Sequence, residues 1–453
     1  MIILKRILTG GKENIIDKII ITIIRLLEPV IFLSFLSIET YGYWLILITI
    51  PYYLSISELG FGDVITNEIN MLKEKKKLKY SKYLFQNLLK FIIYTTLFFL
   101  IIFFLIFFYF NFFDLNHISI QNLEEIIFVL LIYTLVSQIH GIFIKFLSIN
   151  NYFNLSVKLS YINKIFEFIL ISITLFLSNN LLSISLSILF TKVIFLLVVI
   201  YFVRKNIKWF EIGNFKKFKF SIKKNFFKKY IIKSMLYSSA PIGHILRLQV
   251  TTLIIGITLG PAILVLINIY LTVARFPIQI ANIADAIIRI ELAKLYMKDK
   301  LIIFKKYFST NLILVFTIGI IYLILIYFTG EHLIYLWLDG KIEYYNFVFL
   351  FFILYGFINT ITISVSSPLF STNNFKQITI IFLLINIFAI LSLKLFSKDF
   401  GVLFVALNFL FFEILYFFSC FYYSKKKFQL RFEDYKPDLL FIKKILKILF
   451  KTQ

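Results

Sequence analysis

Apolar residues are grouped along the chain in blocks of about 20, separated by short polar segments. A helix of this length crosses the ~30 Å hydrocarbon layer of a membrane at 1.5 Å per residue. The pattern predicts an all-α integral membrane protein with twelve spanning helices. Their expected ranges are 14–37, 41–67, 83–112, 124–147, 158–178, 181–203, 235–257, 262–290, 307–328, 347–370, 378–396 and 400–423.

Composition excludes the soluble alternatives. The 453 residues are 60% hydrophobic and only 16% charged, with a mean hydropathy of +0.89, which no soluble globular domain has. The single cysteine, Cys420, rules out a disulfide framework and a thiolate metal site. Since no metal-ligand spacing, phosphate-binding glycine loop or nucleophile with a base is visible, we expect no metal, no cofactor and no enzymatic activity.

The net charge of +24 is explained by topology. With the N-terminus in the cytoplasm, the segments on that side carry 38 Lys and Arg, whereas the opposite loops carry two, Lys341 and Lys398. Basic residues stay on the cytoplasmic side of a membrane protein, so both termini are predicted to be cytoplasmic. The charge therefore does not indicate a nucleic-acid partner.

The most basic linker divides the chain. Residues 204–234 hold 11 basic residues and one acid, Glu211, and the expected organisation is an N-lobe (1–203), this cytoplasmic linker, a C-lobe (235–423) and a basic amphipathic tail (424–453). Linker and tail both alternate apolar and basic positions at helical spacing. That pattern is typical of helices lying on anionic lipid, although docking of a soluble partner protein would need the same pattern.

Charged residues inside the spans are candidates for function because each costs several kcal/mol unless it is paired or hydrated. Some have a partner three or four residues away, on the same helix face. These pairs either neutralise charge between packed helices or serve function. They are Arg25 with Glu28, Lys164 with Glu167, and Asp285 with Arg289.

Three other cations, Lys192, Arg247 and Arg275, have no carboxylate at these spacings and lie near the middle of their spans. A guanidinium never loses its proton and binds phosphate through two parallel hydrogen bonds. We therefore hypothesise that these three residues, together with Arg25, line a central cavity between the lobes and bind an anionic headgroup.

Three carboxylates lack a local partner: Glu58, Asp63 and Glu413. Two interpretations of them remain open. They either couple a flow of H⁺ or Na⁺, or pair with cations on other helices.

Two stretches resemble bacterial polysaccharide flippases. The first, from Tyr41, reads YGYWLILITIPYYLSISELGFGDVITNEIN and contains Gly42, Trp44 and the segment ELGFG. The second, from Ala240, reads APIGHILRLQVTTLIIGITLGPAILVLINIYLTVARFPIQIANIADAI. These motifs mark the multidrug/oligosaccharidyl-lipid/polysaccharide (MOP) exporter superfamily better than any one substrate.

The resemblance implies a MATE-like fold, in which two six-helix lobes enclose a central cavity, in the bacterial inner (plasma) membrane. The implied function is alternating-access translocation of a polyprenyl diphosphate-linked oligosaccharide, such as an O-antigen (lipopolysaccharide) or capsule repeat unit. Polysaccharide-assembly proteins are the candidate partners, and H⁺ or Na⁺ is the candidate coupling ion. One alternative is a MATE-like drug/cation antiporter that uses Glu58, Asp63 and Glu413 as its coupling sites. Another is a membrane polysaccharide polymerase or glycosyltransferase, against which the short outer loops argue.

Overall fold

The computed structural model describes the whole chain except residues 1, 59, 75, 110–121, 208–223 and 430–453. The described residues form helices and no strands, which confirms the predicted all-α class. Eight of their helices are long and apolar enough to cross a membrane, or nine when a bent pair is counted as one span. The surface helices predicted in the basic linker and tail fall largely outside the described residues.

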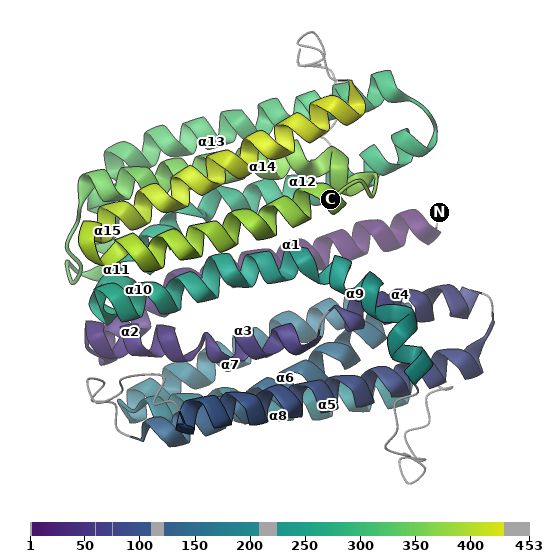
Figure 1. Cartoon of the computed structure of the whole chain (residues 1–453), viewed down its shortest axis with the longest axis horizontal. Helices are drawn as coiled ribbons and strands as arrows, with labels where there is room; N and C mark the ends of the chain where they lie inside the picture. Colours follow the sequence, from purple (N-terminus) through teal and green to yellow (C-terminus); the bar gives the residue numbers. More distant parts are fainter. Residues whose placement is uncertain (1, 59, 75, 110–121, 208–223, 430–453) are drawn as a thin grey trace. The chain divides into compact units, whose positions relative to one another are not determined.

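The chain folds as two compact units, Met1–Leu253 and Ile254–Gln453. In the first, α6 packs against α5, α7 and α8, and α1 packs against α7 (Figure 1). Buried phenylalanines such as Phe61, Phe85 and Phe146 fill its core. The helices of this unit are α1 (Ile2–Phe35), α2 (Ile38–Leu47), α3 (Ile50–Ser55), η1 (Ile56–Glu58), α4 (Phe61–Glu74), α5 (Leu78–Tyr109), α6 (Leu123–Ile149), α7 (Phe153–Leu177), α8 (Leu181–Asn206), α9 (Lys224–Ile245) and the π-helix η4 (Leu246–Val250).

The second span is not the continuous helix that its apolar pattern predicted. It is divided into α2, α3, the 3₁₀ turn η1 and α4, because Pro51 occupies the first turn of α3 and Gly60 takes a φ of +69°. Breaking a helix inside a membrane frees backbone carbonyls that need new donors. The amide of Gln138 on α6 supplies one, since its Nε2 donates to the Leu54 carbonyl at 3.0 Å.

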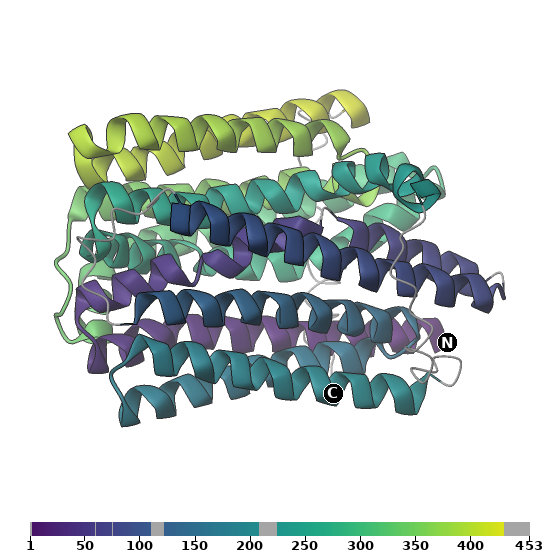
Figure 2. The same cartoon turned by 60° about the horizontal axis from the view of Figure 1, so that its bottom comes forward.

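In the second unit, α13 (Leu301–Leu338) and α14 (Asn346–Ser371) lie side by side with α15 (Lys376–Phe428) (Figure 1). Helix α15 contains both of the final predicted spans. Gly401 divides it into two arms, because its backbone leaves the helical conformation, with φ +65° and ψ −153°. Figure 2 shows its two arms next to each other. The Asn408 side chain joins them by donating to Ser392 Oγ at 2.6 Å.

The eighth predicted span is also bent. It comprises α11 (Pro261–Ala274) and α12 (Phe276–Met297), which meet at Arg275 with a 42° bend. Pro277 has no N–H to donate to the carbonyl of Val273, and the hydroxyl of Tyr322 on α13 donates to that oxygen instead, at 2.6 Å. Each of the twelve predicted spans thus overlaps described helices. The seventh consists of the end of α9, η4 and α10 (Thr251–Leu259).

Candidate functional site

Two of the predicted ion-coupling carboxylates share one lysine. Lys145 on α6 places its Nζ 3.1 Å from Glu58 Oε1 and 2.8 Å from Asp63 Oδ1. The sequence left two interpretations of these acids open, ion coupling or pairing with cations on other helices. The contacts of Glu58 and Asp63 with Lys145 are ion pairs between helices. The spacing pattern missed this cluster, because Lys145 is 82 or more positions away from both acids along the chain.

A glycine makes room for this cluster. A Cβ added to Gly62 would lie 1.7 Å from Glu58 Oε1 and 2.9 Å from its Cδ. The carboxylate therefore rests against the backbone of the first turn of α4, where the positive end of the helix dipole favours an anion. Any larger residue at this position would push Glu58 away from Lys145.

We predict that Gly62→Ala lowers the melting temperature of the purified protein relative to Gly141→Ala. Gly141 is a matched control, because a Cβ there meets no atom within 4 Å and gains only the better helix propensity of alanine. The expected deficit is about 0.5–1 kcal/mol, since the ion pair is partly exposed. In a Glu58→Gln background the deficit should shrink; a full, additive deficit there would contradict the assignment.

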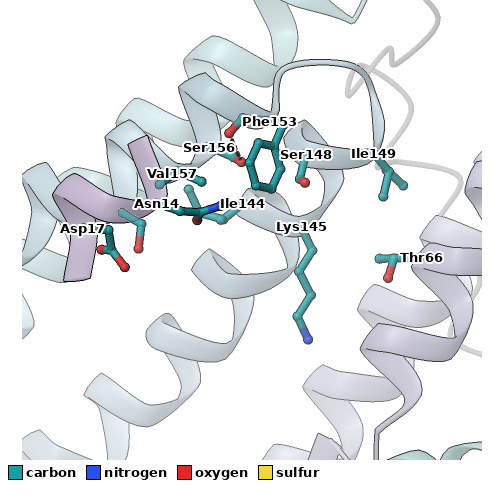
Figure 3. A pocket seen from close by; sticks show the side chains of 11 residues that line it. Asn14, Asp17, Thr66, Ile144, Lys145, Ser148, Ile149, Phe153, Ser156 and Val157 are labelled. Atoms are coloured by element: carbon teal, nitrogen blue, oxygen red, sulfur yellow. Dashed lines mark hydrogen bonds between the residues drawn. The ribbon is translucent and has the colours of Figure 1, made fainter. Parts of the chain in front are cut away.

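A cavity of about 330 Å³ opens beside this cluster, within the first unit. Figure 3 shows Asn14 of α1 next to Val157 of α7, with Ser156 and Phe153 beyond them, while the Lys145 side chain extends away from this group. The volume of this cavity falls in the range of small-molecule sites, and its lining mixes hydroxyl and amide groups with aliphatic side chains, two charged residues and one aromatic ring. The lining residues are Asn14, Asp17, Thr66, Ile144, Lys145, Ser148, Ile149, Phe153, Ser156, Val157 and Ser160.

One predicted pair is wrong. The spacing paired Lys164 with Glu167 on α7, but Lys164 Nζ contacts Asp17 Oδ1 on α1 at 2.9 Å, and Glu167 instead faces Lys192 on α8, with Oε2 3.5 Å from Nζ. Both partners lie on neighbouring helices because α7 packs between α1 and α8. Intrahelical spacing cannot distinguish such contacts from local ones.

Lys192 is therefore not the carboxylate-free cation that its spacing suggested. It is 7% exposed and also lies over the ring of Tyr133, 5.6 Å from the centroid. Tyr133 donates its hydroxyl to Glu167 Oε1 at 3.4 Å. These contacts give Lys192 a structural partner inside the first unit.

The three arginines of the predicted headgroup site belong to three different helical elements. Arg25 is exposed on α1, and Arg247 is buried on the π-helix η4, a rare element that often marks functional positions. Arg275, in the second unit, caps α11 at the bend, and its Nη2 is buried with no hydrogen-bond partner among the described residues. Whether these arginines converge on one cavity remains a prediction.

Two further intramembrane acids, Asp285 and Glu413, belong to the second unit. The predicted pair of Asp285 and Arg289 forms on α12, and the Arg289 guanidinium also lies 4.6 Å from the ring centre of Phe370. Glu413 is fully buried on α15. The sequence spacing predicted the pair of Asp285 and Arg289, and it missed the aromatic contact of Arg289.

No family model matches the sequence, and no curated protein sequence does either. Solved structures do match along nearly the whole chain. An inward-facing multidrug resistance MATE family transporter of the MOP superfamily has a TM-score of 0.69 at 11% identity, covering 90% of this chain and 94% of that one. The lipid II flippase MurJ, in an inward closed conformation, has a TM-score of 0.65 at 16% identity, covering 98% and 93%.

A third structure also matches. A MOP superfamily transporter from Pyrococcus furiosus, described as having a binding pocket of reverse polarity, matches with a TM-score of 0.55 at 12% identity over 94% of this chain and 96% of that one. This chain has the fold of MOP superfamily transporters. The expected fold class is thereby confirmed, whereas identities this low leave the substrate open.

Proposed function

We propose that this chain is a flippase that translocates a polyprenyl diphosphate-linked oligosaccharide, of the O-antigen or capsule repeat-unit type, by alternating access. Its fold is shared with both drug exporters and a lipid-linked flippase, so the choice between them depends on the charges within the membrane. A diphosphate requires cations with free donors, and a cationic drug requires free carboxylates.

The observation that carries the proposal is that three intramembrane carboxylates contact lysines, whereas one intramembrane arginine has an unused hydrogen-bond donor. The carboxylates Glu58, Asp63 and Glu167 each contact a lysine from another helix. At the bend of the eighth span, by contrast, Arg275 has a buried guanidinium nitrogen without a hydrogen-bond partner among the described residues. A buried donor of this kind costs ~1–3 kcal/mol, which a phosphate oxygen would recover on binding.

We infer that Arg25, Arg247 and Arg275 bind the diphosphate. Lys192 is removed from that set, because its ammonium contacts Glu167. The cavity beside Lys145 suits the uncharged sugars of such a substrate, since hydroxyl and amide groups and the Phe153 ring line it. A second phosphate there is disfavoured by Asp17 and by the two carboxylates that already hold Lys145.

The second candidate is a drug/cation antiporter of the same fold. The specific observation in its favour is Glu413, a carboxylate with 0% exposure on α15. Its burial fits a residue that alternates between a proton and a cation. Glu413→Gln would abolish export of a cationic dye by an antiporter, whereas a flippase should show no such export at all.

We further propose a bacterial inner-membrane location with both termini, the basic linker and the tail on the cytoplasmic side. The 38-to-2 distribution of basic residues supports this topology. It also supplies the linker and tail with charge to attract anionic lipid headgroups. Polysaccharide-assembly proteins are the expected protein partners.

Deletion of the gene tests the proposed function in cells. We expect undecaprenyl diphosphate-linked glycan to accumulate on the cytoplasmic face of the inner membrane, where periplasmic probes cannot reach it. A polymerase or glycosyltransferase would instead leave single repeat units accessible from the periplasm. Normal glycan export together with new sensitivity to cationic drugs would favour the antiporter.

A further inference from the structure

A tyrosine holds the bend of the eighth span from both sides. The hydroxyl of Tyr322 on α13 donates to the Val273 carbonyl at the end of α11, at 2.6 Å. The ring of the same tyrosine stacks on Phe276 at the start of α12, with 5.8 Å between the ring centroids. Arg275 lies between these two contact points along the chain. Tyr322 therefore restrains the backbone from which the Arg275 side chain leaves.

A second tyrosine makes the same kind of contact in the first unit. The hydroxyl of Tyr53 on α3 donates to the carbonyl of Gln249 at 2.6 Å. Gln249 belongs to the π-helix η4, which also carries Arg247, a residue with 7% exposure. A π turn interrupts the regular hydrogen-bond ladder of an α-helix, so a donor from another helix helps to fix its backbone. Tyr53 is separated from this turn by nearly 200 positions of sequence.

Both accepting carbonyls lie two positions from an arginine that the proposed function assigns to the diphosphate. A guanidinium binds phosphate through a planar fork of donors, so its direction matters as much as its charge. We propose that Tyr322 and Tyr53 are positioning residues, which fix the backbone of Arg275 and Arg247 so that each guanidinium is directed at the substrate phosphates. This inference rests on the proposed function and extends it to two residues that do not touch the substrate.

Tyrosine-to-phenylalanine variants test the inference, because they keep the ring and remove only the hydroxyl. Tyr53→Phe and Tyr322→Phe should each raise the KM for a fluorescently labelled polyprenyl diphosphate-linked oligosaccharide about 3–10-fold, the range for one hydrogen bond. Their kcat should change little. Tyr152→Phe is the matched control, since Tyr152 donates to the carbonyl of Asn206 at 3.2 Å, two positions from the exposed Arg204 outside the proposed site. It should keep the KM of the wild type.

Double variants separate positioning from a purely structural role. A lysine in place of Arg275 or Arg247 keeps the charge but has no fork to direct. Adding Tyr322→Phe to Arg275→Lys, or Tyr53→Phe to Arg247→Lys, should therefore change the KM by less than about twofold. Increases in KM that persist in full in the lysine backgrounds would overturn the inference. So would a wild-type KM in both single phenylalanine variants.

Binding of inorganic pyrophosphate to the purified full-length protein distinguishes this inference from the proposed function, because it requires no transport. The wild type and Tyr152→Phe should bind with equal affinity, and Tyr53→Phe and Tyr322→Phe about 3–10-fold more weakly. Equal affinity in all four proteins, or no binding by the wild type, would overturn the positioning role. A wild type that binds pyrophosphate in the expected order but moves no lipid-linked oligosaccharide would contradict the flippase function alone.

Discussion

Gly356→Val should yield no stably folded protein, and Gly356→Ala should fold with a clearly lower melting temperature. A Cβ at Gly356 would lie 1.9 Å from the backbone oxygen of Ala274 and 2.7 Å from its carbonyl carbon. Backbone atoms cannot rotate aside, so α14 must move away from the bend of the eighth span. We expect a loss of about 1–3 kcal/mol for alanine and a larger one for valine, measured by thermal unfolding and by recovery of the protein from the membrane fraction.

The matched control for Gly356→Ala is again Gly141→Ala, which adds a methyl group to a helix without meeting another atom within 4 Å. It should fold as the wild type does. If Gly356→Ala were equally stable, α14 would not pack against the bend, and the described geometry around Ala274 and Arg275 would be incorrect.

Arg275→Ala should reduce the translocation rate by roughly 10–150-fold, the effect of losing a charge-assisted hydrogen bond worth ~1.5–3 kcal/mol. Its stability should not fall. The Arg275 side chain makes no capping hydrogen bond at the start of α12, and its Nη2 is buried without a hydrogen-bond partner in the described part of the chain. A loss of activity at unchanged or raised melting temperature is therefore the signature that we expect, measured on reconstituted protein at limiting substrate.

Two further variants serve as comparisons for Arg275→Ala. Arg275→Lys keeps the charge but loses the forked geometry of the guanidinium, and it should retain intermediate activity. Lys294→Ala removes an exposed cation from the same helix, where it pairs with Glu291, and it should be indistinguishable from the wild type. If Arg275→Ala transported at the wild-type rate, the assignment of this residue to the diphosphate would be abandoned.

The sequence predicted the helices well, because spanning a membrane requires long apolar blocks and little else. All twelve expected spans coincide with helices. The apolar pattern alone did not predict the breaks in the second and eighth spans, although Pro51 and Pro277 stand at or next to them. A break depends on which neighbouring side chain can satisfy the freed carbonyls, as Tyr322 does for Val273, and that information is not local.

The same limit applies to the candidate site. The pair of Asp285 and Arg289 was predicted because both residues lie on one helix, four positions apart. The partners of Lys192, Lys164 and Lys145 all come from other helices, and helix packing decides them. Spacing therefore identified which residues carry charge into the membrane, but not which of these charges are already neutralised.

Translocation by the purified protein tests the central claim most directly. Proteoliposomes containing a fluorescently labelled polyprenyl diphosphate-linked oligosaccharide would be assayed for the fraction of label that a membrane-impermeant quencher reaches over time. We predict that the wild-type protein moves the labelled lipid between leaflets, that Arg275→Ala does so at least roughly tenfold more slowly, and that Lys294→Ala matches the wild type. Protein-free rates for the wild type, together with exchange of a cationic dye for H⁺ or Na⁺ in the same vesicles, would contradict the flippase assignment.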